Sequence, residues 1–262
     1  MIITCCCCTF RRPRQVGHII AMFLKQTHQD RRLFILDDGC VDDCVIEYTD
    51  LNVHIVRLRM RFKSLGLKRN AACRMALQCW LDTEAICPWD DDDYFLPHHL
   101  YSMNAALENS DWSLPSEVLY RNDDGTFRRH LTGPGKFFHS GHGYRIDALL
   151  RANPHDDGFL EPYPDHLSGP EDQGLFRRLE ATDATICDPI TLTGLPPSYC
   201  YGSNDGLLHI SGLLKDCQDT GADAYAKIGE QSCEPQEIII EPPPGIELDC
   251  PIILPEILPR PF

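Results

Sequence analysis

The chain has 262 residues, 43% of them hydrophobic, which is enough to bury the core of one large α/β domain or two small ones. Its formal net charge of −15 argues against nucleic-acid binding and against adsorption to an anionic membrane, since both require excess positive charge. No apolar stretch reaches the roughly 20 residues of a membrane span, and the amino terminus does not resemble a signal peptide, so a cytoplasmic protein is expected.

The first predicted strand, residues 1–8, contains four of the 14 cysteines, Cys5–Cys8. Neighbouring side chains of a strand point to opposite faces of a sheet, so these four thiols cannot converge on one metal ion. No Cys-x-x-Cys pair is followed by a second one at zinc-ribbon spacing. The cysteines are therefore expected to be free thiols that pack as small apolar residues.

The first hundred residues alternate between strand and helix patterns. Apolar runs predict strands, and apolar residues three and four positions apart predict helices. The predicted strands are 1–8, 32–36, 52–58 and 85–89, and the predicted helices begin at Pro13 or span 67–81 and 98–107. Such alternation is typical of a parallel sheet with right-handed crossovers, so an α/β fold is expected.

The pattern changes after Ser110. Runs at 112–120 and 126–130 flank Asn122-Asp123-Asp124-Gly125, which predicts a hairpin. Further elements are predicted as strands near 136–145, 184–187 and 198–201 and helices near 146–152 and 170–179, with a functional loop over 153–169. The predicted organisation is one domain over 1–233, with halves 1–110 and 111–233, followed by a proline-rich tail over 234–262 that cannot be helical.

Four consecutive aspartates, Asp90–Asp93, follow the strand predicted at 85–89. Carboxylates grouped at the end of a buried strand repel one another, and a bound cation would relieve that repulsion. Mg²⁺ and Mn²⁺ commonly take one or two carboxylates together with phosphate oxygens of a substrate. Two other predicted strands also end in polar residues, at 9–12 and 37–38, and parallel strands share one carboxyl edge. A metal that holds a phosphorylated ligand is predicted at this edge.

Several blocks of sequence resemble the family-2 inverting glycosyltransferases of the GT-A fold. The blocks are Cys8-Thr9-Phe10-Arg11-Arg12-Pro13, Gln26-Thr27, Phe34–Gly39, Leu65–Ala72, Asp90–Pro97 and Glu171-Asp172. Cys8 stands where that family often has proline, and Arg11 where it often has asparagine. The resemblance covers residues 1–110 well and 135–210 loosely. It implies a Rossmann-like, mostly parallel sheet flanked by helices, with a smaller mixed acceptor-side region.

The resemblance also implies an activity, the transfer of a hexosyl group from a nucleotide-diphospho-sugar to an acceptor hydroxyl with inversion. A UDP-sugar is favoured as the donor, and the acceptor would be a glycan, a lipid-linked molecule or a small molecule, as in polysaccharide biosynthesis. Mn²⁺ or Mg²⁺ would be the cofactor. The donor would be bound by Thr9, Arg11, Asp38, Arg69, Asp90 and Asp91.

For the remaining site residues, the resemblance makes Asp172 the general base and Glu171 an acceptor-side residue. Asp92 and His209 would bind the metal, and Asp93 would cap or orient the next helix. Each position also has a plain structural interpretation. Glu171 and Asp172, for example, would complement the dipole at the first turn of a helix. His139 and His142 are expected to be structural.

Two other functions stay open at this point. A sugar-phosphate nucleotidyltransferase would carry a glycine-rich loop after the first strand, but no glycine lies between Thr9 and Val16. A non-catalytic glycosyltransferase-like module could use its tail to bind a partner, although the presence of both Asp92 and Asp172 argues against it.

Overall fold

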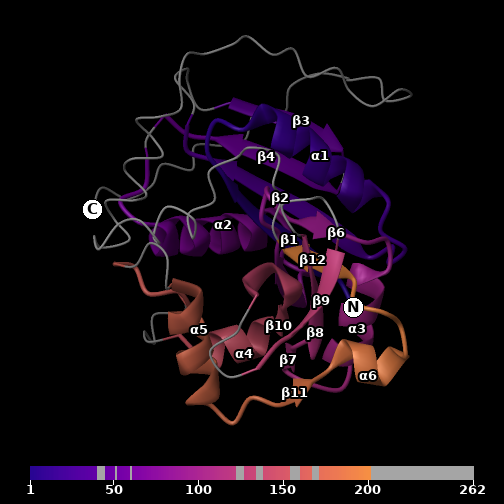
Figure 1. The fold of residues 1–262 in the computed structure, drawn as a ribbon. Helices are drawn as coiled ribbons and strands as arrows, with labels where there is room; N and C mark the ends of the chain where they lie inside the picture. The colour runs from indigo at the N-terminus through magenta and orange to yellow at the C-terminus, as the bar shows by residue number, and fades with distance from the viewer. Residues whose placement is uncertain are drawn as a thin grey trace, which may run out of the picture.

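The protein folds around two β-sheets with helices packed against them (Figure 1). This computed structural model describes residues 1–39, 45–50, 52–59, 61–121, 127–133, 138–153, 160–166 and 171–201. The large sheet has eight strands in the order β11-β7-β10-β5-β1-β2-β4-β3, and the small sheet has four in the order β6-β12-β8-β9. His209 and the tail over 234–262 lie outside the described residues.

The elements alternate regularly only in the first half of the chain. The large sheet consists of β1 (Ile3–Thr9), β2 (Arg31–Asp37), β3 (Val45–Asp50), β4 (Val53–Arg57), β5 (Ala85–Pro88), β7 (Trp112–Ser113), β10 (Gly143–Arg145) and β11 (Ile186–Cys187). The small sheet consists of β6 (Tyr94–Phe95), β8 (Glu117–Arg121), β9 (Phe127–Leu131) and β12 (Tyr199–Tyr201). The helices are α1 (Pro13–Leu24), α2 (Leu65–Cys79), α3 (His99–Leu107), α4 (Ile146–Arg151), α5 (Glu171–Glu180), α6 (Pro189–Thr193) and the 3-10 turn η1 (His139–Gly141).

Strand β1 lies at the centre of the large sheet, parallel to both of its neighbours, β2 and β5. The strand order reverses at β1, because β2 follows on one side and β5 on the other. Ligands of open α/β sheets bind beyond the carboxyl ends of the strands at such a reversal. The chain therefore places the residues after β1 and the aspartates after β5 side by side at the edge where a ligand is expected.

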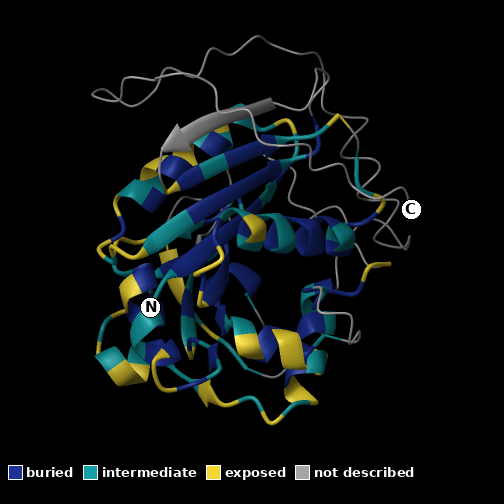
Figure 2. Ribbon diagram, turned by 180° about the vertical axis from the view of Figure 1, so that it is seen from behind, coloured by how far each residue is buried: buried dark blue, intermediate teal, exposed yellow. Residues whose placement is uncertain are grey.

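Both faces of β1 are buried, which explains its continuous apolar sequence (Figure 2). Cys5 and Cys7 pack in a core with α1 and α3 on one face, and Cys6 packs with α2 and α5 on the other. The described cysteines are free thiols. Burial raises the pKa of the Cys7 thiol well above its usual range, so the thiol stays protonated. These observations confirm the prediction that the Cys5–Cys8 run packs as core.

The two helices that flank the site begin at sequence signals of different kinds. Pro13 occupies the first turn of α1, where its missing N–H leaves no hydrogen bond unmade. Ser64 caps α2 by accepting a hydrogen bond from the Leu67 N–H at 3.2 Å. Helix α2 differs from an ordinary amphipathic helix, because its second turn buries Lys68, Arg69 and Asn70.

Several sequence-based predictions for the second half were wrong in detail. The predicted strand 112–120 is two strands in different sheets, β7 and β8, and Pro115, which has no N–H for a ladder, lies between them. In the described part of the predicted strand 136–145, His139–Gly141 forms a 3-10 turn, and the strand itself is the three-residue β10, Gly143–Arg145. The antiparallel pairing of β8 with β9 confirms the hairpin. None of the described helices combines the length and hydropathy needed to cross a bilayer.

Candidate active site

Asp91 is the central buried carboxylate of the site. Its side chain is 5% exposed, and it accepts hydrogen bonds from the Thr9 hydroxyl at 2.6 Å and from Arg12 at 2.8 Å. Burial and the like charge of Asp92 raise the pKa of Asp91 to about 6, although Arg12 opposes this shift. The Thr9 hydroxyl donates to Asp91, and the predicted contact of Thr9 with the donor stays a prediction. Arg12 was missed in the sequence, although it is adjacent to the predicted Arg11.

Asp92 lies at the outer side of the same cluster. Its carboxylate is 3.4 Å from Arg12 Nη1, so Arg12 serves both Asp91 and Asp92. The chemistry of this donor set fits a hard divalent cation, since carboxylate oxygens are the ligands that Mg²⁺ and Mn²⁺ prefer. The described residues contain no group of three or more His, Cys, Asp or Glu side chains placed to hold a metal. Such a cation would therefore need ligands beyond these, of which donor phosphates are one source.

Asp90 connects the acidic run to the second half of the chain. The Arg69 guanidinium donates to both of its oxygens, at 3.0 and 3.3 Å, and also donates to Glu171 at 3.1 Å. Burial alone would raise the pKa of Asp90, but Arg69 outweighs burial and holds this pKa well below its usual range. Arg69, Asp90 and Glu171 are thus brought together, although 102 residues separate the outer two.

Asp38 is fully buried and is occupied by the protein itself. Lys68 Nζ lies 2.5 Å from one oxygen and also donates to the Thr9 carbonyl, and the Phe62 N–H donates to the other oxygen at 3.0 Å. The predicted contact of Asp38 with a nucleobase stays a prediction. Lys68 was not predicted as a site residue from the sequence. The only feature that could have indicated it is its position directly before Arg69 on α2.

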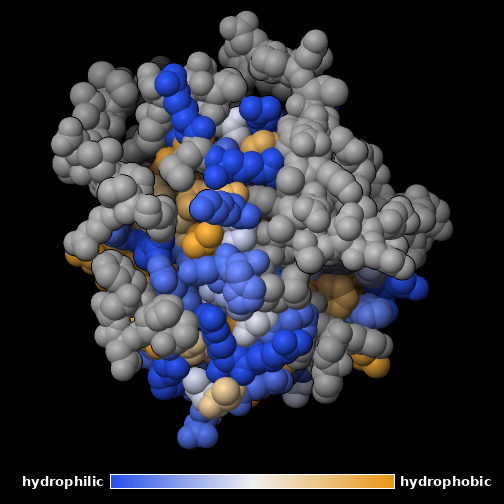
Figure 3. Space-filling model, turned by 90° about the vertical axis from the view of Figure 1, so that its left-hand side faces the viewer, coloured by the Kyte–Doolittle hydropathy of each residue, from blue (hydrophilic) through white to orange (hydrophobic). Residues whose placement is uncertain are grey.

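Arg11 follows β1 at the carboxyl edge of the large sheet, in a backbone conformation set by its neighbours. Its φ is 53°, in the left-handed region, and its side chain donates to the Gly39 carbonyl at 2.9 Å. A Cβ at position 39 would be only 2.5 Å from Arg11 Cγ, so glycine is required there. The Arg11 guanidinium is exposed above the Phe10 ring, where it could meet a ligand. On the face of the molecule that Figure 3 shows, the described surface is mainly hydrophilic.

Asp172, the predicted general base, has a raised pKa. It is half-buried in the first turn of α5, and one of its oxygens accepts a hydrogen bond from the Gln173 N–H at 2.6 Å. Burial first, and the like charge of Glu171 second, raise the pKa of Asp172 to about 7. A base works best when its pKa lies near the working pH.

The predictions for Asp93 and for the two histidines, His139 and His142, had different outcomes. Asp93 was predicted to cap or orient the next helix. The capping part was wrong, since His98 occupies the cap position of α3. Asp93 accepts a 2.7 Å hydrogen bond from the Tyr199 hydroxyl of β12, a partner that no local pattern shows. His139 and His142 are buried, and burial lowers the pKa of each, so both stay neutral in the interior.

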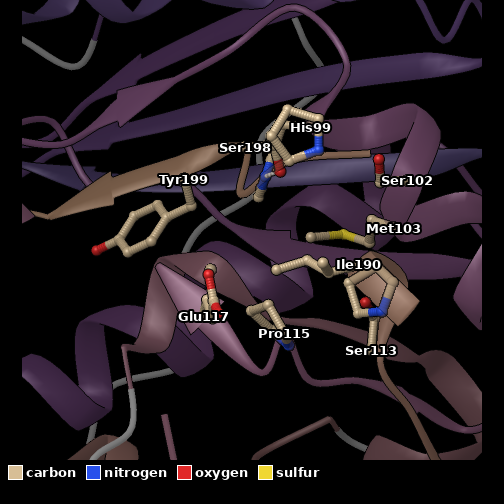
Figure 4. Close-up of a pocket in the computed structure, with 12 residues that line it drawn as sticks. His99, Ser102, Met103, Ser113, Pro115, Glu117, Ile190, Ser198 and Tyr199 are labelled. Carbon is tan, nitrogen blue, oxygen red and sulfur yellow. Dashed lines mark hydrogen bonds between the residues drawn. The ribbon is translucent and has the colours of Figure 1, made fainter. Parts of the chain in front are cut away.

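A separate pocket lies between α3, α6 and the strands β7, β8 and β12 (Figure 4). It encloses about 310 Å³ of empty space, including its open mouth, and His99, Ser198 and Tyr199 lie on its wall. None of the predicted site residues lines this pocket. The acidic cluster at the carboxyl edge is therefore the candidate active site.

The comparison with family models decides the family. The model of glycosyl transferase family 2 matches residues 4–160, which is more than half of the chain. The chain belongs to glycosyl transferase family 2. The match includes β1, the residues after it and the whole acidic run. Glu171 and Asp172 lie beyond its end.

Solved structures show that this family-2 chain has the GT-A fold. It is similar to S. aureus TarS 1–349 in complex with UDP, with a TM-score of 0.55 and 17% identity over 77% of this chain and 60% of that one. It is also similar to TarS 1–349 in complex with UDP-GlcNAc, with a TM-score of 0.55 and 14% identity over 88% and 71% of the two chains. The family-2 chain thus spans 60% of TarS 1–349 in the first of these matches. The search of curated proteins found no significant match.

Proposed function

We propose that this family-2 member is a metal-dependent inverting glycosyltransferase that moves a sugar from a nucleotide-diphospho-sugar to an acceptor hydroxyl. The observation that carries the proposal is the placement of Asp172, whose pKa is raised to about 7, in one charge network with the acidic run. This arrangement supports the proposal, because a base that interacts with the acidic run would act close to a diphosphate and its cation. A cytoplasmic location and a role in polysaccharide biosynthesis belong to the same proposal.

The proposed reaction is a single displacement. Asp172 takes the proton of the acceptor hydroxyl as the acceptor oxygen attacks the anomeric carbon of the sugar. The bond between that carbon and the diphosphate oxygen breaks, and its electron pair stays with the leaving nucleoside diphosphate. Because attack and departure occur on opposite faces of the carbon, the anomeric configuration is inverted.

Asp92 would hold the cation in this reaction. A divalent cation, when bound, neutralises the charge that develops on the leaving phosphate. Arg12 contributes from the protein side, because its guanidinium keeps Asp91 and Asp92 together in spite of their repulsion. His209, the second predicted ligand, lies outside the described residues.

A UDP-sugar is the proposed donor. The similar TarS structures are complexes with UDP and with UDP-GlcNAc, which supports this choice. Arg11, at the open edge beyond β1, is the proposed contact for the nucleotide, with Asp38 and Arg69 behind it. The acceptor is proposed as a glycan, a lipid-linked molecule or a small molecule.

A binding screen followed by a turnover assay tests the proposal. The full chain is screened by thermal shift against UDP, GDP and ADP, each with and without Mn²⁺, because a ligand of the native state raises the melting temperature. Release of UDP from UDP-GlcNAc, UDP-glucose and UDP-galactose is then measured. We expect Mn²⁺-dependent stabilisation by UDP and release from at least one donor. Folded protein that neither binds nor turns over any of these would contradict the proposal.

The Asp92→Asn variant provides the control for the metal. It should abolish the Mn²⁺-dependent part of UDP binding, because it removes the charged oxygen that would bind the cation. Full Mn²⁺-dependent binding by this variant would show that Asp92 is not the ligand.

A further inference from the structure

Three consecutive residues of α2 point into the protein although all are polar. Lys68, Arg69 and Asn70 are 1%, 8% and 0% exposed. Buried polar side chains are costly unless each finds partners, so their destinations show what this turn of the helix does. Lys68 bonds within the first half of the chain, to Asp38 and Thr9. Arg69 and Asn70 reach into the second half.

Asn70 fixes the segment that precedes α5. Its side-chain amide donates to the Tyr163 carbonyl at 2.9 Å and to Asp165 at 2.7 Å, and its oxygen accepts from the Tyr163 N–H at 3.0 Å. Ser64, at the cap of α2, also donates to the Asp165 carbonyl. Helix α2 therefore fixes the position of the backbone of residues 163–165 through these hydrogen bonds.

Arg69 makes the second connection, through charge. Its planar guanidinium binds Asp90 with two nitrogens and Glu171 with the third, a geometry that lysine cannot reproduce. The Glu171 side chain is only 3% exposed, which leaves it little surface for an acceptor to contact. Glu171 is also the residue directly before Asp172, so whatever holds Glu171 holds the start of α5.

We propose that Arg69 and Glu171 are positioning residues, which keep Asp172 at a fixed place relative to the acidic run and adjust its strength as a base. The proposal rests on the proposed function, because it assigns Asp172 the role of proton acceptor. It gives Glu171 a role inside the protein and none in contact with the acceptor.

The charges around Asp172 support the second part of the proposal. Glu171 on α5 and Asp90 in the acidic run disfavour its ionised form, whereas Arg69 on α2 favours it. Tyr144 on β10 also lies close enough to interact, and burial raises its own pKa, so it stays neutral. Of the charged neighbours, Glu171 has the largest effect. Neutralising Glu171 should therefore make Asp172 the weaker base.

The Glu171→Gln variant tests the charge alone, since glutamine keeps the shape and can still accept the hydrogen bond from Arg69. In protein labelled with ¹³C at aspartate carboxyls, the Asp172 signal is identified by its absence from Asp172→Asn. We expect its midpoint, about 7 in the native chain, to fall by about one pH unit in Glu171→Gln. The acidic limb of UDP release from UDP-GlcNAc should move by the same amount.

The Glu171→Asp variant tests position alone, because it keeps the charge but shortens the reach to Arg69. We expect a midpoint that stays near that of the native chain and a rate of UDP release lowered about tenfold, with UDP binding unchanged. The two variants therefore separate the two parts of the proposal.

Glu161→Gln is the matched control. Glu161 also pairs with an arginine of α2, Arg74, but its charge is not among those that shift the pKa of Asp172. It should leave both the midpoint and the rate unchanged. An unshifted midpoint in Glu171→Gln, or a native rate in Glu171→Asp, would overturn the proposal. Absence of UDP release from the native chain would contradict the proposed function instead, and the titration would still decide whether Glu171 acts on Asp172.

Discussion

The proposed donor half, residues 1–110, and the described part of the proposed acceptor half, residues 111–201, differ in the length of their longest strands. β1 and β2 have seven residues each and run parallel through the core, whereas β7 and β11 have two residues each and β10 and β12 three. Short strands make few ladder bonds, so the acceptor half relies more on packing against its neighbour. The proposed base, Asp172, lies in this second half, and α2 of the donor half holds the residues around it.

The largest effect that would test this comparison is on catalysis. Asp172→Asn removes the proposed base and should lower UDP release about a thousandfold, within the range that general bases contribute. Binding of UDP with Mn²⁺, a property of the donor half, should stay within about twofold of the native value by calorimetry. Loss of binding together with turnover would show that the two halves do not divide the work in this way.

The next effect is on stability, at the charge that joins the halves. Arg69→Met leaves Asp90 and Glu171 without their shared partner and should lower the free energy of unfolding by about 3–5 kcal/mol, measured by urea denaturation. Arg74→Met is the control, since Arg74 and Glu161 are more exposed and should contribute less than about 1 kcal/mol. Equal losses in both variants would mean that the ion pairs of Arg69 between the halves stabilise the protein no more than the Arg74–Glu161 pair does.

A smaller loss of stability is expected at the neutral connection. Asn70→Ala leaves the Tyr163 N–H and carbonyl without their partner and should cost about 2–3 kcal/mol in the same experiment. Asn109→Ala provides the comparison, because Asn109 is exposed and should change stability by less than about 0.5 kcal/mol. Hydrogen exchange should also quicken in residues 160–166 and α5 of the Asn70 variant, and unchanged exchange there would contradict the role of α2 as a clamp.

The smallest effect concerns pH. The pKa of Asp172 is about 7 in the folded protein against a reference of 3.8, so the folded state binds more protons between these values. Protonated Asp172 contributes its full stabilisation at pH values below the reference pKa. This contribution is lost as the pH rises through the pKa of Asp172 in the folded protein. Asp172→Asn, which cannot ionise, should therefore melt several degrees above the native chain at pH 8, with the difference vanishing toward pH 4. A native chain that melts higher at pH 8 would refute the raised pKa.

The sequence was more informative about the donor half than about the acceptor half. The strands predicted at 1–8, 32–36, 52–58 and 85–89 lie within two residues of β1, β2, β4 and β5, because long buried strands leave a continuous apolar run. Strands of two residues such as β6 leave no such pattern. The six-residue edge strand β3 in the first half and the five-residue helix α6 in the second half were also missed.

At the site, the sequence identified the kind of residue but not its partners. Asp90–Asp93 were expected at a strand end, and β5 ends at Pro88, with only Trp89 between the strand and the aspartates. That Asp91 bonds to Thr9 and Asp93 to Tyr199 depends on contacts between residues 82 and 106 positions apart. No local pattern carries information over such distances, which is why Arg12, Lys68 and Tyr199 were missed.

The sequence by itself determined the family, the α/β alternation and the carboxyl edge at which acidic residues gather. It did so because periodicity and short motifs are properties of neighbouring residues. Only the tertiary structure decided which carboxylates are paired with a positive charge of the protein and which have a raised pKa. Arg69 holds Asp90 and Glu171, while burial leaves Asp172 with a pKa of about 7. The charge state of each group depends on burial and on neighbours from other elements, and folding alone brings these together.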